Sequence, residues 1–268
     1  LVQHYKEKGN WPALTKCHER LLALYQTTTN LNEKGDVRTF GTYYRVGFYG
    51  NGSDAFGKVN GKEFVYREPG LTKLPEINAR YAFFFSAKLH TEISVFKDSS
   101  KVDTTKLDPK QCKLQVCLVV SQYRQLTILE PYFGLESAAE QLKRRTYYDK
   151  HTHIRSFSFD TPFTMQGGAH SSKMDEQYKR RTVLSVAHSF PYLLKRQLVV
   201  ERSELTLTPI QCVIEDVKKR IGQLNAQITP ASGAPALQPL SQVLSGSVNT
   251  QVNVGTKEVC QTFLAPEN

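Results

Sequence analysis

The spacing of hydrophobic residues changes twice along the chain and divides it into three stretches. In the first stretch, Leu14, Cys17, Leu21 and Tyr25 follow one another at intervals of three or four residues. This spacing is typical of an amphipathic helix, and Pro12 suits its first turn, where no amide hydrogen is needed. We therefore expect the chain to open with a helix that ends before residue 41.

The second stretch, from residue 41 to about 207, is rich in short segments with strand character. Its first aromatic run ends at Gly50-Asn51-Gly52, a sequence typical of a tight turn between strands. Strands this short and frequent favour an antiparallel β-sandwich, with one helix inserted at 71–85. In 114–120 hydrophobic residues alternate strictly, so we expect one face to be buried and the other at least half covered. The remaining strand segments are 64–66, 155–159, 182–186, 198–200 and 205–207.

The third stretch begins with Thr208-Pro209-Ile210-Gln211, which places a cap, a first-turn proline and a capping-box glutamine in order. Residues 229–239 contain three prolines and one glycine and should end this helix. Helical spacing resumes in 240–244 and in 259–264, with a loop between Gly246 and Gly255. The apolar stripe of the first helix consists of Ile210, Val213, Val217, Ile221, Leu224 and Ile228.

Lysine and arginine outnumber acidic residues 35 to 25, which gives a net charge of +10 and a pI of about 9.3. This balance favours nucleic acid, an anionic membrane or an acidic partner without deciding between them. The densest basic clusters, 143–145 and 179–181, lie in β-prone sequence. We therefore expect at least part of each cluster to be a solvated strand face.

The five cysteines form no Cys-X-X-Cys pair, which disfavours a disulfide framework and a structural zinc site. A reducing, cytoplasmic location follows as an expectation, because the chain shows neither a leader pattern nor an apolar run of roughly 20 residues. The chain opens at Leu1 without a methionine and stops at Asn268 after a helical pattern. We interpret it as a fragment of a longer protein.

A set of longer strings occurs in a fixed order along almost the whole chain. In this order they resemble the second DOCK-homology region of the dedicator of cytokinesis proteins, and more closely its Zizimin-related branch. The pattern departs from the family at LVVSQYRQLT, residues 118–127, where we expect an extended or bulged strand. The strings are GTYYRVGFYG at 41–50, GKEFVYREPGLTKLPEI at 61–77, LDPK at 107–110, EPYF at 130–133, DEQYKRRTVL at 175–184, HSFPY at 188–192, LTPIQCVIEDV at 207–217 and QVLSGSVNTQVNVG at 242–255.

The resemblance implies an α+β fold of three lobes. Residues 1–40 would be the end of a helical lobe, and residues 41–206 an antiparallel β-sandwich lobe. Residues 207–268 would then be the start of a helical-bundle lobe, cut shortly after the loop. The order helix, strands, helices that the hydrophobic spacing predicts agrees with this division.

The function that the resemblance implies is guanine-nucleotide exchange on Rho-family small GTPases of the Rac or Cdc type. Such a factor promotes GDP release without covalent chemistry and needs no cofactor, because the GDP and the Mg²⁺ belong to the partner GTPase. In the family, a valine on the loop that interrupts a helix acts as nucleotide sensor, and Val252 occupies the matching position. Its neighbours Gln251, Asn253, Val254 and Gly255 would shape the loop and contact the GTPase.

Val252 suits this role physically, because a β-branched side chain is stiff and offers no oxygen ligand to a hard cation. Inserted at the Mg²⁺ site, it would remove coordination without replacing it. From the letters QVNVG alone, however, Val252 is an ordinary loop residue, and only the family context favours the sensor. The resemblance also implies membrane recruitment through regions outside this chain and no direct binding of nucleic acid, and it leaves open a homodimer of the full-length protein.

Two other functions remain open. A basic β-rich module could bind RNA or acidic lipid through the clusters near Phe157 and Phe159, with strong salt dependence. A scaffold could bind a GTPase without exchange activity. His151 and His153 beside Asp149 could mark a metal site, but no third ligand is evident, so we expect no metal.

Overall fold

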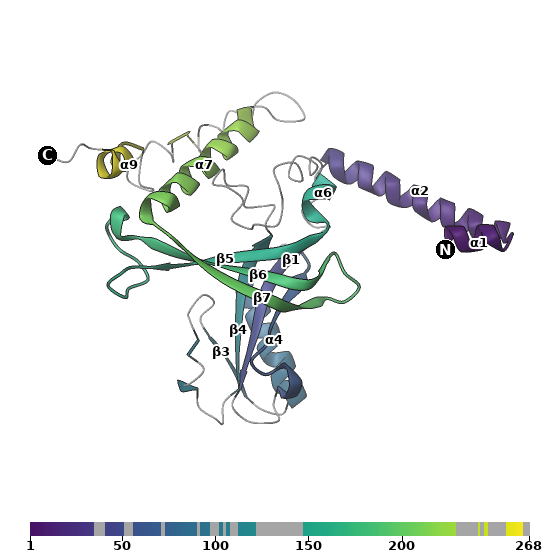
Figure 1. The fold of residues 1–268 in the computed structure, drawn as a ribbon, viewed down its shortest axis with the longest axis horizontal. Coiled ribbons are helices and arrows are strands. Elements are labelled where there is room, and N and C mark those ends of the chain that lie inside the picture. The colour runs from purple at the N-terminus through teal and green to yellow at the C-terminus, as the bar shows by residue number, and fades with distance from the viewer. Residues whose placement is uncertain are drawn as a thin grey trace.

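The computed structural model describes residues 1–34, 41–50, 56–70, 73–89, 92–96, 102–103, 106–107, 112–121, 147–228, 241, 244–245 and 256–264. The chain opens with α1 (Val2–Glu7) and α2 (Trp11–Lys34), which confirms the predicted N-terminal helix. α2 extends away from the β lobe and meets it at α6 (Tyr147–His151) (Figure 1). There the backbone N–H of Tyr148 donates to Asn32 Oδ1 at 2.9 Å.

The β lobe is a seven-stranded sheet in the order β1-β2-β7-β6-β5-β4-β3, with a further pairing between β1 and β4. The described pairings are antiparallel except for that of β3 with β4. The α+β class and the antiparallel β lobe are therefore confirmed, and the β1–β4 pairing closes the sandwich into a ring. The strands are β1 (Thr42–Gly50), β2 (Glu63–Glu68), β3 (Ile93–Phe96), β4 (Cys112–Ser121), β5 (Ile154–Phe163), β6 (Tyr178–Phe190) and β7 (Arg196–Leu207).

Two predicted strand segments, 198–200 and 205–207, are a single strand in the structure, so their separation was wrong. The polar residues between them pair in register with β6, from Ser185↔Glu201 to Thr182↔Glu204. The polar stretch at 201–204 is therefore not a turn. A strand at the surface of a sheet can carry polar residues and keep its backbone hydrogen bonds to the neighbouring strand.

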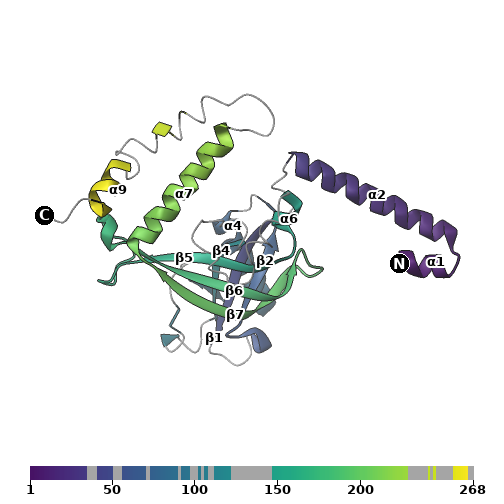
Figure 2. The same ribbon diagram turned by 45° about the horizontal axis from the view of Figure 1, so that its top comes forward.

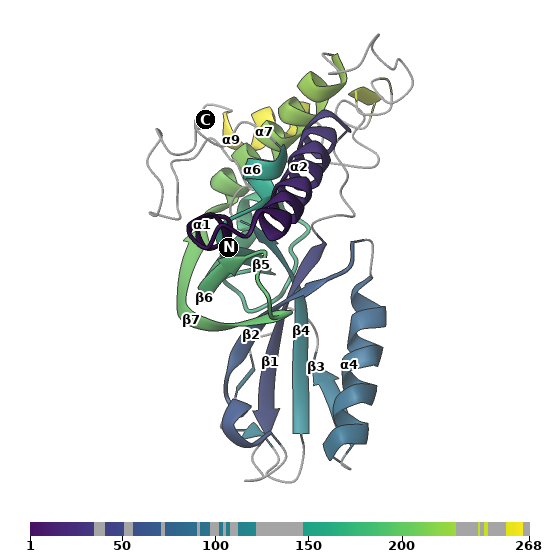
Figure 3. The same ribbon diagram turned by 90° about the vertical axis from the view of Figure 1, so that its right-hand side faces the viewer.

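The sheet formed by β2, β1, β4 and β3 is covered on both faces (Figure 3). α4 (Leu74–Leu89) lies on one face, close to the helix predicted at 71–85. β5, β6 and β7, which form the second sheet of the sandwich, lie across the other face. Because side chains alternate along a strand, β1 and β4 supply residues to both cores. The core beneath α4 includes Tyr44, Val46, Phe48, Ile77, Tyr81, Phe85, Leu114 and Val116, and the core between the sheets includes Tyr43, Val65, Cys117, Val119, Ile154, Phe157, Leu184, Val186 and Phe190.

The strand predicted over 114–120 is confirmed as part of β4, but its burial differs from the prediction. Gln115, Cys117 and Val119 on the second face are all buried. Leu114 and Val116 are fully buried under α4, whereas Leu118 on the same face is 48% exposed and belongs to neither core. The extension predicted around 118–127 is seen as far as Ser121, and the rest of that segment lies outside the described residues.

The chain enters β1 through Gly41, which has a φ of +78°. A Cβ atom at this position would lie 2.3 Å from the carbonyl oxygen of Glu68, at the end of the neighbouring strand. Glycine is therefore required here both for the left-handed backbone and for the close approach of β2.

The predicted C-terminal helices are confirmed as α7 (Pro209–Ile228) and α9 (Thr256–Phe263), which lie near one another beyond one end of β6 and β7 (Figure 2). The apolar stripe of α7 does not face the β lobe, because Ile210, Ile221 and Ile228 are 42%, 50% and 51% exposed. The buried positions of α7 are instead Cys212 and Glu215. Among the described helices, none combines the length and the hydrophobicity that a transmembrane span requires.

Candidate functional site

The predicted sensor loop, with Gln251, Val252, Asn253, Val254 and Gly255, lies outside the described residues. The elements on either side of it are described, since α7 ends at residue 228 and α9 begins at residue 256. The described part of the candidate site is therefore the contact between α7 and the β lobe, from which the C-terminal helices extend. We call this contact, formed by residues 160, 179, 181, 207–216 and the short helix at 174–176, the α7 junction.

α7 starts at a capping box that ties it directly to the last strand. Leu207, the final residue of β7, is fully buried, and the next residue caps the helix. The backbone N–H and the hydroxyl of Thr208 donate to Gln211 Oε1 at 2.9 and 3.1 Å. With Pro209 fixing the backbone of the first turn, the direction in which α7 leaves the sheet is set locally.

Arg181, on β6, joins α7 to the sheet through two bidentate contacts. Its Nε and Nη2 atoms donate to the two carboxylate oxygens of Asp160 on β5, each at 2.8 Å. Its Nη1 and Nη2 atoms donate to the two carboxylate oxygens of Glu215 on α7, again at 2.8 Å. Because the guanidinium is a planar fork, such paired contacts fix orientation as well as distance.

Burial makes the Arg181 contact structurally important. Arg181 is 3% exposed and Glu215 is 6% exposed. Burial by itself lowers the pKa of Arg181, but its hydrogen bonds to Asp160 and Glu215 raise the pKa more, so the side chain stays charged. A buried charge of this kind is tolerated only while its partners remain in place.

Weaker contacts surround Arg181. Lys179 Nζ lies 3.7 Å from Asp216 Oδ1, a second bridge from β6 to α7. The short helix η4 (Met174–Glu176) contacts both α7 and α9. Cys212 is buried against the end of β7, and its Sγ lies 3.9 Å from the carbonyl oxygen of Leu207.

The basic cluster 179–181 is thus on a strand and partly solvated, as predicted. Lys179 and Arg180 are partly exposed, whereas Arg181 is buried in the junction. The other cluster, 143–145, lies outside the described residues.

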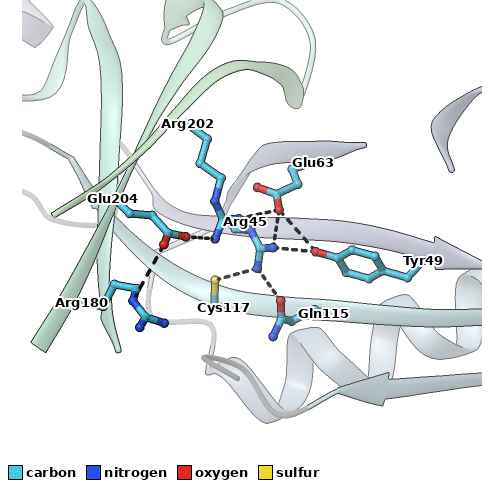
Figure 4. A network of polar contacts seen from close by, with 8 residues as sticks. All are labelled: Arg45, Tyr49, Glu63, Gln115, Cys117, Arg180, Arg202 and Glu204. Atoms are coloured by element: carbon cyan, nitrogen blue, oxygen red, sulfur yellow. Dashed lines mark hydrogen bonds and ion pairs between the residues drawn. The ribbon is translucent and has the colours of Figure 1, made fainter. Parts of the chain in front are cut away.

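A second polar cluster lies beside the intersheet core, where Arg45 Nη1 is 3.7 Å from Cys117 Sγ (Figure 4). Arg45 on β1 donates to Gln115 Oε1 at 2.8 Å, to the Tyr49 hydroxyl at 2.8 Å and to Glu63 Oε1 at 2.6 Å. Arg202 on β7 also donates to Glu63 Oε1, at 2.8 Å. Arg45, Glu63 and Arg202 therefore form a row of ion pairs that links β1 to β2 and β2 to β7.

The charges of this cluster stabilise one another. Burial raises the pKa of Glu63, but the hydrogen bond from Arg45 and the charges of Arg45 and Arg202 lower it more, so the pKa ends below its ordinary value. Burial lowers the pKa of Arg45, but the hydrogen bond to Glu63 and the charge interactions with Cys117, Tyr49 and Glu63 together raise it more, so the pKa ends above its ordinary value. The adjoining cavity of about 300 Å³ is lined in part by Phe159, Arg180 and Glu204. Arg45 and Glu63 therefore both stay charged at neutral pH, as expected of ion pairs with a structural role.

Two of the buried thiols are not activated for covalent chemistry. Burial raises the pKa of the thiols of Cys112 and Cys212, so both remain protonated and poor nucleophiles at neutral pH. Within the described ranges, which include Asp149, His151 and His153, no group of three histidine, cysteine, aspartate or glutamate side chains is placed to hold a metal ion.

The rings of Phe157 and Phe159, beside which an RNA-binding surface was considered, are not available for base stacking. Phe157 is fully buried in the intersheet core, and Phe159 is partly buried beneath the guanidinium of Arg45, 5.4 Å from its ring centroid. Neither ring forms the exposed platform that base stacking requires.

The hydrophobic pattern did not identify Arg45, Arg181 or Glu215 as site residues. Arg45 carries a usable signal, because it lies within the aromatic strand β1, whose other residues are mostly buried hydrophobics. Arg181 stands in a run of three basic residues and carries no such signal. Its burial depends on the position of α7, which a local pattern does not contain.

Comparison with family models identifies two matching segments. Residues 99–189 match the model described as DHR-2, Lobe B, and residues 225–268 match DHR-2, Lobe C. The first segment covers much of the β lobe, and the second begins within α7 and includes α9.

Comparison with individual proteins gives the same result over nearly the whole chain. The chain is 42% identical to Dedicator of cytokinesis protein 8 of Homo sapiens, over 94% of this chain and 11% of that protein. It is 42% identical to Dedicator of cytokinesis protein 7 of Homo sapiens, over 99% and 12%. It is 31% identical to Dedicator of cytokinesis protein 9 of Homo sapiens, over 100% and 13%. The chain thus spans little more than a tenth of the length of these relatives.

Proposed function

Since this chain belongs to the dedicator of cytokinesis family, within its DHR-2 region, we propose that it is part of a guanine-nucleotide exchange region for Rho-family small GTPases. The observation that carries the proposal is the consecutive match to lobes B and C of that region, in the order in which the β lobe and the C-terminal helices follow one another. The family prediction is confirmed, while the assignment to the Zizimin-related branch stays a prediction.

An exchange factor shifts a GTPase toward its nucleotide-free form only if it binds that form more tightly than the loaded form. Such differential binding needs a surface held in a fixed position. The α7 junction supports this role, because Arg181 and the capping box hold the base of the C-terminal helices on the β lobe. The exposed residues Ile210, Ile221 and Ile228 leave an apolar face of α7 open for further packing.

The proposed mechanism places Val252 at the Mg²⁺ site of the bound GTPase. Gln251, Asn253, Val254 and Gly255 shape the loop around it and contact the GTPase. Loss of Mg²⁺ coordination weakens phosphate binding, because the ion bridges the phosphate oxygens of the nucleotide. The proposed partner is a GTPase of the Rac or Cdc type, in the cytoplasm, with membrane recruitment through other regions of the longer protein.

The test follows the release of fluorescent GDP from purified Rac and Cdc GTPases by the complete three-lobe region. The Val252→Ala variant should slow release by about tenfold or more, in the range typical of removing one interaction made mainly in the transition state. Val243→Ala, just before the loop in the sequence, serves as the matched control and should retain most of the rate of GDP release. An unchanged rate for Val252→Ala would show that the sensor assignment is wrong.

The scaffold alternative predicts a different result in the same assay. A region that binds a nucleotide-free GTPase but leaves GDP release at its uncatalysed rate is a scaffold and not an exchange factor. Release that is unchanged for every Rho-family GTPase tested, with binding retained, would therefore replace the proposed function.

A further inference from the structure

The turn between β6 and β7 presents three consecutive apolar side chains to solvent. Tyr192, Leu193 and Leu194 are 41%, 96% and 61% exposed. We call residues 191–194 the β6–β7 tip. Because β6 and β7 are antiparallel and their other ends, Tyr178 and Leu207, lie at the α7 junction, the tip lies at the opposite end of the sheet (Figure 1).

Contacts on both sides of the tip hold it in place. The Tyr192 ring stacks on His188, with ring centroids 4.9 Å apart and an interplanar angle of 2°. On the other side, Lys195 Nζ lies 2.6 Å from Glu68 Oε1, and the backbone N–H of Arg67 donates to the Lys195 carbonyl at 2.9 Å. With both flanks anchored, Leu193 and Leu194 remain exposed in the folded lobe.

The surroundings of the tip are basic. A cavity of about 500 Å³ beside it is lined by Arg67 and Lys195, together with residues of the tip, with Gly41 just before β1 and with Pro69 just after β2. The carboxylate in this lining, Glu68, has a side chain that is 0% exposed. It also lies 3.2 Å from Arg80, so the described surface around the tip carries excess positive charge.

We propose that the β6–β7 tip inserts into an anionic lipid bilayer. Leu193 and Leu194 enter the boundary between headgroups and acyl chains, and Tyr192 lies at the level of the headgroups. Arg67 and Lys195 face the lipid phosphates from the cavity beside the tip. The membrane contact belongs to this chain itself and does not depend on the proposed exchange activity.

The observations favour a bilayer over a protein partner. An apolar patch of three residues is small for a stable protein interface, which usually involves about 20 to 30 residues on each side. A few exposed apolar side chains beside basic residues are, by contrast, sufficient for weak and reversible binding to anionic lipid.

The first test is co-sedimentation of the 268-residue chain with vesicles, without any GTPase. We expect binding to phosphatidylcholine vesicles that contain phosphatidylserine, and much weaker binding to phosphatidylcholine alone. The Leu193→Ser/Leu194→Ser variant should bind the anionic vesicles about tenfold or more weakly, because each buried methylene contributes to partition. Arg67→Gln should also weaken binding, and added salt should reduce the binding of the unaltered chain.

The matched control is Leu22→Ser/Leu24→Ser on α2, because these leucines are 58% and 62% exposed but lie far from the tip along the chain. This variant should bind as tightly as the unaltered chain, and circular dichroism melting should show that both double variants are folded. The proposal would be overturned if both double variants lost vesicle binding equally, or if the unaltered chain did not bind anionic vesicles.

A fluorescent reporter tests the orientation of the chain on the bilayer. Trp11 is the one tryptophan of the sequence, so Leu193→Trp in a Trp11→Phe background places a single indole at the tip. Insertion predicts a blue shift of its emission with anionic vesicles. Vesicle binding without a blue shift would assign the contact to another surface, and binding of a purified protein partner that requires the tip, without vesicle binding, would also refute the proposal.

Discussion

Arg45 and Arg181 are the buried residues around which the polar parts of the β lobe are arranged. Each is at most 3% exposed, and each donates to carboxylates from other elements. They differ in what they connect, since Arg45 links strands within the lobe and Arg181 links the lobe to α7. A buried ion pair adds little net stability, but removing one partner leaves an uncompensated charge in the interior.

Glu63 should make the stability of the lobe depend on pH. Its folded pKa lies below its ordinary value, because the hydrogen bond from Arg45 and the charges of Arg45 and Arg202 outweigh the opposing effect of burial. A lowered folded pKa contributes stability above the unfolded value of about 4.3, and this contribution is lost as the pH falls through the folded pKa. Denaturant unfolding between neutral pH and pH values near 3 should therefore show falling stability as the pH drops.

Glu63→Gln should be less stable than the unaltered chain at neutral pH and should show a flatter loss on acidification. Glu201→Gln, at an exposed position on β7, is the control and should keep the original pH dependence. A Glu63→Gln profile parallel to that of the unaltered chain would contradict the assigned role.

At the scale of elements, α7 is attached to the β lobe by polar contacts and not by its apolar stripe. Arg181→Met should therefore destabilise the chain by about 3–5 kcal/mol, because it leaves Asp160 and Glu215 without the charge between them. Arg180→Met is the matched control on the same strand. Its partly exposed guanidinium lies 3.9 Å from Glu204, and its loss should cost less than about 1 kcal/mol.

Urea unfolding of the two variants measures the difference. In the complete three-lobe region, Arg181→Met should also slow GDP release more than Arg180→Met, since it loosens the base of the helices that flank the proposed sensor loop. Equal costs of unfolding for the two variants would show that Arg181 does not hold the junction.

Elements with strong local signals could be predicted from the sequence. The capping box at Thr208 and Gln211 and the aromatic run of β1 each contain the chemistry that defines them, and both are found where predicted. The pairing of β1 with β4 has no local signal, because Arg45 and Cys117 become neighbours only when the ring closes. The burial of Arg181 has none either, and the loop around Val252 remains a prediction because it lies outside the described residues.

At the scale of the whole molecule, the two cores share the sheet that contains β1 and β4. They should therefore unfold together, because losing either core removes packing from the same strands. Ile77→Val beneath α4 and Ile154→Val between the sheets remove one methylene each from fully buried positions. Each should lower the stability of a single transition by about 0.5–1.5 kcal/mol.

Thermal unfolding followed by far-ultraviolet circular dichroism and by the near-ultraviolet signal of the tyrosines and phenylalanines would measure this transition. Both variants should shift the two signals together and by similar amounts. Two separate steps, one sensitive to Ile77→Val and the other to Ile154→Val, would show that the cores are independent.

The closed ring also has a consequence for how the protein is made. β2 lies near the start of the lobe, yet its outer neighbour is β7, through pairs such as Phe64↔Leu198. During synthesis the N-terminal strands leave the ribosome first, so β2 keeps an open edge until the last strand of the lobe has been translated. Closing contacts between such distant segments is slow, and unpaired strand edges bind other chains. The nascent lobe is therefore a natural client for chaperones until β7 emerges, and a chain that stops before Arg196 would never lose that exposed edge.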